Sequence, residues 1–348
     1  MILLYKRFRI GNDIVSFCIV ALLLLGGLHA VVSFWRMDKL YYYLRNLVIV
    51  YSMFSFFAGY YLLKYLPAFI KKIKKILQVY IIFFLFAPVS QFFFERFGVA
   101  TLFPAVLKKN MHGSFPVLIS LNIIYAITYS SSTAMLIACF YILVLLSPGY
   151  KFFVQLIAIG FVLFAGLFIY LMPNLNLINE GYTIYNQNPI YRVIESHPLL
   201  SIDGNSTWRL VLWNQVLAGH FPGNIAGIGF GTPLFDYFPV YEIEKFNTLP
   251  YVVGAHNSYI YLFGRMGIVY LFITIVMYNF IIREYFYYKS FYYHNGTILV
   301  FWSFFAISLI AFFNPVLESP IFSGSYWLVL GFLAKAIHNR IYMQQQIS

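Results

Sequence analysis

Charge and cysteine are both scarce in this sequence. Only 10% of its 348 residues are charged, whereas a soluble domain carries about 25%, so the composition excludes a water-soluble enzyme. The two cysteines, Cys18 and Cys139, lie in separate apolar runs, which predicts that they do not pair. No cluster of His, Cys, Asp and Glu has the spacing of metal ligands, so the sequence predicts neither a metal nor a cofactor.

Hydrophobic residues are correspondingly abundant. They make up 61% of the chain, aromatic residues make up 22%, and the mean hydropathy is +0.78. This composition is typical of lipid-facing and interfacial surface, and the length fits about eight to ten membrane spans. The net charge of +12 comes from basic residues between apolar runs. That placement favours the positive-inside bias of membrane proteins and argues against nucleic-acid binding. The expected fold is an all-α, polytopic integral membrane protein.

Apolar runs of spanning length recur along the chain and are separated by basic clusters. The first run is too long for the core of a signal peptide, so we expect an uncleaved span. The lysines between 71 and 75 mark a cytoplasmic segment. The predicted runs are Ile14–Trp35, Leu47–Leu63, Ile76–Phe94, Phe152–Met172, His256–Ile282, Gly296–Phe313 and Ile321–Ala334.

One further apolar run leaves the topology open. Phe115–Ser147 has 33 residues without a charge, about 50 Å of helix, which is too long for one straight span and short for two. Ser130–Ser132 near its middle suggests a break. The basic tail after residue 334 reads as cytoplasmic, which places the polar stretch Pro173–Ala255 outside. Counting the spans from the N-terminus also places this stretch outside if Phe115–Ser147 crosses the membrane once. The alternative is that Phe115–Ser147 forms two short helices and that a re-entrant segment lies around Phe97–Leu107.

The polar stretch gives the chain its predicted organisation. Residues 1–129 form N-terminal transmembrane helices, residues 130–282 form a core that includes the external loop 173–255, and residues 283–348 form C-terminal helices and a cytoplasmic tail. The loop holds six of the 11 acidic residues and only three basic ones.

Two loop arginines are candidates for binding an anion. Arg209 lies in the predicted helix 205–217. The expected N-terminal cap of this helix is Asn205, Ser206 or Thr207, and Gly219 and Pro222 are expected to end it. Arg209 lies on the same face as Trp213 and Val216. It either reaches toward lipid phosphate or binds a phosphate diester or diphosphate with two of its guanidinium nitrogens. Arg192 is the second candidate, and an ordinary loop arginine is its alternative interpretation.

Two further features follow the arginines. The Gly227–Gly231 turn either presents backbone N–H groups to an anion or is an ordinary turn. His256 precedes a helix that Asn257 or Ser258 caps, and it is either a general base or oxyanion partner, or an interfacial hydrogen-bonding residue.

Two charged residues complete the set of candidates. Arg265 lies about 13 Å deeper along the helix than His256 and about 180° around it, so it faces protein or water and does not share a contact with His256. Asp203 is an alternative base, because glycosyl transfer often uses a carboxylate.

The order of these motifs resembles the bacterial O-antigen ligase and O-antigen polymerase superfamily. The matching elements cover about residues 130–282: Ser130–Thr133, Arg209 with Trp213, Gly227–Gly231, the sequence His256-Asn257-Ser258-Tyr259, and Gly264–Ile268.

The resemblance implies a fold like that of C-type glycosyltransferases, in the bacterial inner membrane, with the site on the periplasmic face. It implies metal-independent transfer of a glycan from undecaprenyl diphosphate to an acceptor sugar hydroxyl. Arg209, His256 and Arg192 would be catalytic. The substrate would be bound by Trp213, Gly227, Gly229, Asn257, Tyr259 and Arg265.

Polymerase is the preferred activity, and three alternatives stay open. A ligase would pass the glycan to lipid A core or protein. A flippase would need polar residues along several spans, which contain almost none apart from Arg265. A non-catalytic scaffold would not require Arg209 or His256. The expected partners are the lipid-linked oligosaccharide, a glycan or lipid A core acceptor, membrane lipid and a chain-length regulator.

Overall fold

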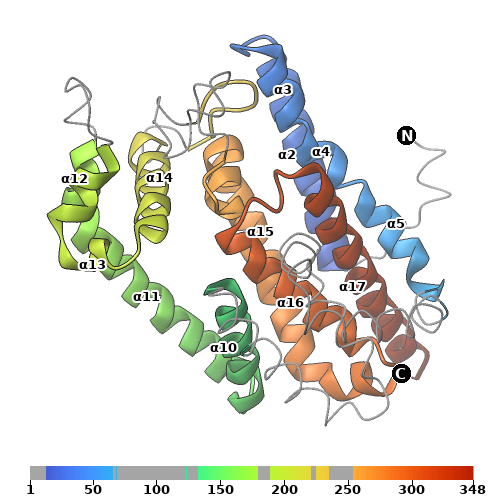
Figure 1. Ribbon diagram of the computed structural model, residues 1–348. Coiled ribbons are helices and arrows are strands. Elements are labelled where there is room, and N and C mark those ends of the chain that lie inside the picture. The colour runs from blue at the N-terminus through green and yellow to red at the C-terminus, as the bar shows by residue number, and fades with distance from the viewer. Residues whose placement is uncertain are drawn as a thin grey trace. The chain divides into compact units, whose positions relative to one another are not determined.

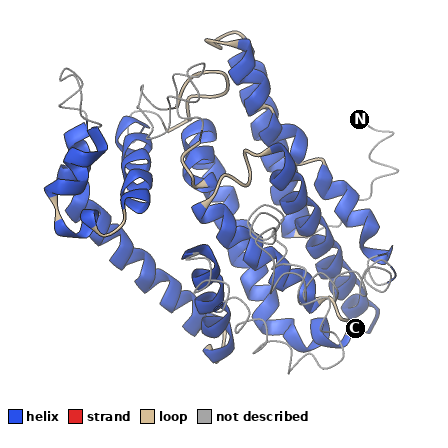
Figure 2. Ribbon diagram, in the orientation of Figure 1, coloured by secondary structure: helices blue, strands red, loops and turns tan. Residues whose placement is uncertain are grey.

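The computed structural model describes residues 13–65, 68, 123, 132–178, 189–220, 225–234 and 254–347. Within these ranges the chain is helical and contains no strand (Figure 2). The predicted run Ile76–Phe94, the segment Phe97–Leu107 and most of the first half of Phe115–Ser147 lie outside the described residues.

The elements in Figure 1 are α2 (Ile14–Phe34), α3 (Leu40–Asn46), α4 (Val48–Ser52), α5 (Ser55–Leu62), η1 (Leu63–Tyr65), α10 (Ser132–Leu146), α11 (Tyr150–Leu175), η3 (Asn176–Ile178), α12 (Pro189–Ser196), α13 (Pro198–Ser201), α14 (Gly204–His220), α15 (Ser258–His294), α16 (Ile298–Phe313) and α17 (Pro320–Ile347).

Four helical stretches in the described part are long and apolar enough to cross a membrane. They are Ile14–Phe34, Leu40–Tyr65, Tyr150–Leu175 and Ser258–His294. Two shorter apolar helical stretches, Met135–Val144 and Ile298–Phe313, accompany them. An all-helical chain with these stretches is a helical membrane protein in its composition and architecture. The total of eight to ten spans and the side on which residues 173–255 lie stay predictions.

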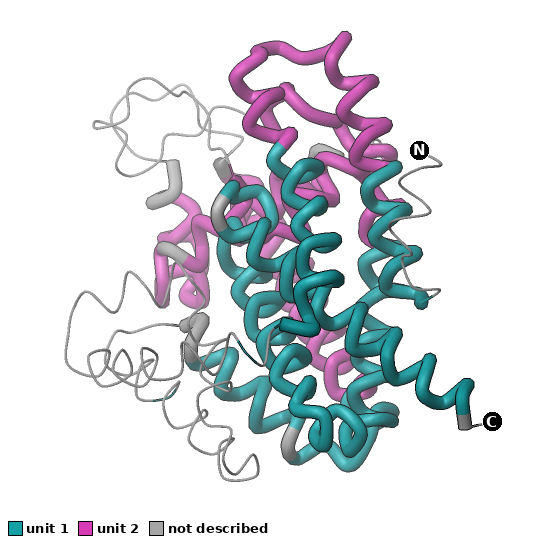
Figure 3. The backbone as a smooth tube through the Cα atoms, turned by 90° about the vertical axis from the view of Figure 1, so that its right-hand side faces the viewer, with its two compact units in different colours: residues 1–24, 48–153, 273–348 teal, residues 25–47, 154–272 magenta. Residues whose placement is uncertain are grey.

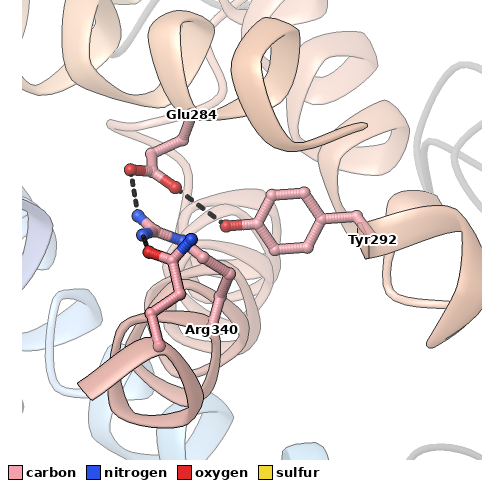
Figure 4. Close-up of polar contacts among 4 residues, drawn as sticks. Glu284, Tyr292 and Arg340 are labelled. Atoms are coloured by element: carbon pink, nitrogen blue, oxygen red, sulfur yellow. Dashed lines mark hydrogen bonds and ion pairs between the residues drawn. The ribbon is translucent and has the colours of Figure 1, made fainter. Parts of the chain in front are cut away.

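The C-terminal helices are longer than the sequence predicts. A basic link was expected after Ile282, but α15 continues to His294, and α17 continues past the expected end at Ala334 to Ile347. The basic residues that suggested this link, Arg283, Lys289 and His294, are exposed on α15. Arg340 forms a buried ion pair with Glu284, and the Tyr292 hydroxyl donates a hydrogen bond to the same carboxylate, 3.0 Å away (Figure 4). The prediction of a basic link directly after Ile282 is therefore wrong, and the basic tail after Ala334 is part of α17.

The chain divides into two compact units, which Figure 3 colours separately. Unit 1 consists of residues 1–24, 48–153 and 273–348, and unit 2 consists of residues 25–47 and 154–272. Helices α2, α11 and α15 contribute residues to both units. The three predicted parts, residues 1–129, 130–282 and 283–348, are each continuous in sequence, whereas each compact unit combines segments that are distant in sequence. The boundaries of the three parts stay a prediction.

Close helix packing defines unit 1. Helix α17 packs along α5 and also contacts α4 and α16, and α16 contacts α10. Glycines make the α5–α17 approach possible. A Cβ atom at Gly59 would lie 2.0 Å from the Leu328 carbonyl oxygen, and one at Gly331 would lie 2.1 Å from the Phe56 carbonyl oxygen. Small residues at helix contacts are typical of membrane proteins, because they let the backbones approach closely.

Short helices dominate the polar part of unit 2. Helices α12, α13 and α14 pack against one another. The Thr207 hydroxyl donates to the Leu200 carbonyl oxygen, 2.7 Å away, which joins α14 to α13. The Trp213 indole N–H donates to the Ala255 carbonyl oxygen over 2.8 Å, so α14 is fixed beside the residue that precedes His256.

Candidate functional site

Helix α14 carries the first part of the candidate site. It begins at Gly204, so Asn205, Ser206 and Thr207 lie within the helix, and the prediction that one of them caps it is wrong. The Ser206 hydroxyl instead donates to the Asp203 carboxylate, and the Thr207 N–H donates to the Asp203 carbonyl oxygen over 3.0 Å. Asp203, which we considered as an alternative base, therefore organises the start of α14.

The start of α15 carries the second part. The predicted cap is confirmed: the Asn257 side-chain oxygen accepts hydrogen bonds from the N–H groups of Tyr259 and Ile260, at 3.0 and 3.1 Å. His256, directly before this cap, has a φ of 49° and is the one non-glycine residue with positive φ among those described. Such a conformation costs free energy, and residues that hold one are concentrated at functional sites.

His256 meets two consecutive residues of α14. The Trp208 ring lies edge-to-face with the imidazole, with 4.9 Å between ring centroids. Arg209 is close enough to act electrostatically on the same imidazole. Burial, and then the Arg209 charge, lower the pKa of His256 to about 4. The ring is therefore neutral at pH 7 and can accept a proton. Burial also lowers the pKa of Arg209, while the Asp203 carboxylate raises it.

Buried N–H donors are available around this contact. The Trp208 Nε1, Arg209 Nε and Asn257 Nδ2 atoms are buried and have no hydrogen-bond partner among the described residues. A buried donor without a partner costs about 1–3 kcal/mol. Three such donors on residues next to His256 fit a ligand that is rich in oxygen, such as a phosphate or a sugar.

The glycine turn uses its own N–H groups within the protein. The Ile228 and Gly229 N–H groups donate to the carbonyl oxygens of Gly264 and Arg265, both at 2.9 Å. The next two N–H groups donate to side chains: Phe230 to the Ser33 hydroxyl at 2.8 Å and Gly231 to the Asn46 amide oxygen at 3.1 Å. Substrate binding by Gly227 and Gly229 stays a prediction, and the observed contacts favour the interpretation of an ordinary, protein-bound turn.

Arg265 holds the same turn. Its Nη1 donates to the carbonyl oxygens of Gly229, at 3.1 Å, and Thr232, and its guanidinium lies 5.1 Å from the centre of the Tyr261 ring. The side chain is buried, as a charge within a span should be. These contacts account for Arg265 as a support of the turn, and its predicted role in substrate binding stays untested.

The remaining predicted residues differ in their surroundings. Trp213 is buried, bonded to the Ala255 carbonyl oxygen and packed at 6.1 Å against Phe164, so it supports the fold of unit 2. Arg192 is exposed on α12, and in the described residues it has no hydrogen bond or ion pair with Arg209 or His256. Tyr259 is half-buried, and its backbone N–H donates to the Asn257 side-chain oxygen that caps α15.

Sequence reasoning missed Trp208. The helical spacing drew attention to Trp213, four residues after Arg209, whereas the residue that faces His256 is the immediate neighbour of Arg209. Its signal was present, since an indole beside the candidate arginine is unusual in a polar loop, but only the fold pairs it with a histidine 48 positions later.

The chain is thus a helical membrane protein with a polar site at the start of α15. Among the described residues, no group of three or more His, Cys, Asp or Glu side chains could hold a metal ion. Comparisons with models of protein families, with curated proteins and with solved structures find no match for this chain.

Proposed function

We propose that this protein is a polysaccharide polymerase of the O-antigen type, which transfers glycan from undecaprenyl diphosphate to an acceptor sugar hydroxyl on the outer face of the membrane. The observation that carries the proposal is the meeting of Arg209 with a neutral His256 among buried N–H donors that have no partner among the described residues. A cation and a neutral base that interact electrostatically match the two tasks of this reaction.

The transfer is one substitution at the anomeric carbon of the donor. The acceptor hydroxyl oxygen forms a bond to this carbon, the bond between the carbon and the diphosphate oxygen breaks, and its electron pair leaves with the diphosphate. His256 receives the hydroxyl proton, and Arg209 stabilises the negative charge that develops on the leaving group.

The electrostatic interaction between Arg209 and His256 fits a reaction in which binding of the donor diphosphate comes before proton transfer. Burial and Arg209 lower the pKa of His256 to about 4, so the base is neutral before the substrate arrives. A diphosphate bound to Arg209 offsets the positive charge and raises the pKa of His256, which makes proton transfer to the ring more favourable. The donor would thus activate the base for its own transfer.

The location of Arg209 argues against a lipid-phosphate contact as its only role. Its Nε is buried, and its charge interacts with the Asp203 carboxylate and with the His256 imidazole. A guanidinium that only anchors a helix to lipid headgroups would direct its nitrogen atoms to the surface.

The test compares arginine variants in cells and with purified protein. We expect Arg209→Ala to abolish polymer formation, and Arg209→Lys to restore little, because an ammonium cannot form two parallel bonds to a diphosphate. Arg36→Ala is the matched control, since Arg36 is an exposed arginine of unit 2. The measurement is the surface-glycan ladder at equal protein level, with transfer from a defined lipid-linked donor.

The same assay separates the alternatives. A deletion strain with core plus one repeat unit indicates a polymerase, whereas bare core with accumulating lipid-linked polymer indicates a ligase. A normal ladder in Arg209→Ala cells would exclude Arg209 from the reaction and with it the proposal.

A further inference from the structure

The orientation of the His256 ring needs an explanation. A histidine that accepts a proton with one ring nitrogen is usually oriented by a hydrogen bond at the other. Among the described residues, neither nitrogen of His256 has a hydrogen-bond partner, and the Trp208 ring, at 4.9 Å, is its aromatic contact. The positive φ of 49° fixes the direction in which the side chain leaves the backbone, but it leaves rotation about the side-chain bonds open.

Trp208 is itself held in place from both ends of α14. Thr207, its neighbour, is bonded to the Leu200 carbonyl oxygen, and Trp213, further along the helix, is bonded to the carbonyl oxygen of Ala255, the residue before His256. The first bond fixes the start of α14 to α13, and the second fixes the helix beside the residue before His256. The Trp208 indole is therefore a rigid surface for the imidazole.

We propose that Trp208 is a positioning residue for His256: the indole edge holds the imidazole in the orientation that receives the acceptor's proton and keeps water away from it. The proposal rests on the proposed function for the identity of the reaction. The contact itself, and its effect on the histidine, can be measured without any substrate.

Removal of the indole has a defined electrostatic consequence. Burial is the larger cause of the lowered pKa of His256, and Arg209 is the charged group that faces the ring. Without Trp208, water reaches the imidazole while Arg209 stays, so the pKa of His256 rises from about 4 toward its ordinary value of 6.5. The histidine then becomes protonated at a higher pH, and the acidic limb of the rate profile moves upward.

The experiment follows the His256 pKa and turnover in the full-length protein in nanodiscs. Histidine labelled with ¹³C is titrated by NMR, with His256→Gln to assign its signal, in Trp208→Ala, Trp208→Leu and Trp208→Phe. We expect the Ala and Leu variants to raise the pKa, and to lower kcat at pH 6 by about 10-fold or more, within the range that a general base contributes. Trp208→Phe, which keeps an aromatic ring, should keep the pKa of His256 near its native value, while its kcat reports separately on the loss of the indole N–H. Trp35→Ala, at an exposed tryptophan of unit 2, is the control.

Distinct results separate this proposal from the proposed function. An unchanged His256 pKa in folded Trp208→Leu protein overturns the positioning role, even if the protein is a polymerase. A His256 pKa that rises in Trp208→Phe as much as in Trp208→Ala also overturns it, because the aromatic ring contact would then not be what keeps the imidazole buried. A raised pKa in a protein that transfers no glycan would support the contact and refute the polymerase.

Discussion

His256 holds a backbone conformation that costs free energy for every residue with a Cβ atom. At φ 49° the Cβ crowds the backbone, at a cost of about 1–2 kcal/mol. The penalty gives a prediction that does not depend on the reaction. His256→Gly should be more stable than His256→Ala by about 1 kcal/mol, although both lack the imidazole. Thermal unfolding of the two purified variants in the same detergent measures the difference, and equal midpoints would show that the turn relaxes.

The buried imidazole also links stability to pH. The pKa of His256 is about 4 in the folded protein, because of burial and Arg209, and 6.5 when the side chain is exposed. The unfolded chain therefore binds a proton more readily, and the contribution of His256 is present above pH 6.5 and is lost as the pH falls toward 4. We expect the native protein to lose more thermal stability than His256→Gln between pH 7.5 and 4.5. Parallel losses would mean that the imidazole is solvated.

At the scale of the element, α15 contains a break that the Gly227–Gly231 turn completes. Gly267 has a φ of 74°, and the Ile268 N–H donates to the Ile225 carbonyl oxygen at 2.8 Å instead of to Gly264 one turn back. The Gly264 carbonyl oxygen accepts from the Ile228 N–H in exchange. The turn and the helix thus satisfy each other's backbone groups, which is required wherever a helix is interrupted at membrane depth.

The break gives a prediction with a control in the same unit. A Cβ at Gly267 would lie 2.1 Å from the Ile225 carbonyl oxygen, and the positive φ adds strain. We expect Gly267→Ala to lower the free energy of unfolding by more than about 2 kcal/mol. Gly166→Ala is the control, because a Cβ there meets nothing within 4 Å and alanine favours a helix by up to about 1 kcal/mol. Equal unfolding midpoints for the two variants would contradict the described turn–helix contact.

At the scale of the whole molecule, a buried ion pair ties α17 to α15 in unit 1. Arg340 binds Glu284 (Figure 4). It also lies 3.9 Å from the centre of the Tyr288 ring and donates to Gln344 at 2.7 Å. Loss of one member of such a pair leaves the other charge buried without its counterion. The pair helps to explain why α17 stays helical through the basic tail after Ala334.

A double-mutant cycle tests the pair. Arg340→Met and Glu284→Leu should each destabilise the protein by about 3–5 kcal/mol, because each leaves one buried charge. The double variant should be more stable than either single variant, since no uncompensated charge remains. Chemical unfolding of the four proteins gives the coupling energy, and additive losses would mean that the two charges act independently.

Patterns of hydrophobicity and capping predict much of this protein before any coordinates. The apolar runs at Ile14–Trp35 and Phe152–Met172 correspond to α2 and α11, and the Asn257 cap lies where the sequence places it. These features depend on neighbouring residues, so local rules suffice. The predicted cap of α14 is wrong because several neighbouring polar residues could cap the helix, and the sequence does not show that Asp203 makes the bonds at its start. Helices α15 and α17 extend beyond the predicted apolar runs, where the distant partners Glu284 and Arg340 pair with each other.

The amino-acid order by itself determined a helical membrane protein with a polar loop, and it singled out Arg209 and His256 as chemically notable. Only the tertiary structure decided that Trp208 faces His256, that Trp213 serves the fold, and that Arg265 and the glycine turn bind each other. The physical reason is the separation in sequence over which each effect acts. Lipid preference and helix capping depend on residues a few positions apart. Burial of a donor, contact between two rings and a shifted pKa depend instead on a distant segment that packs against the group and excludes water.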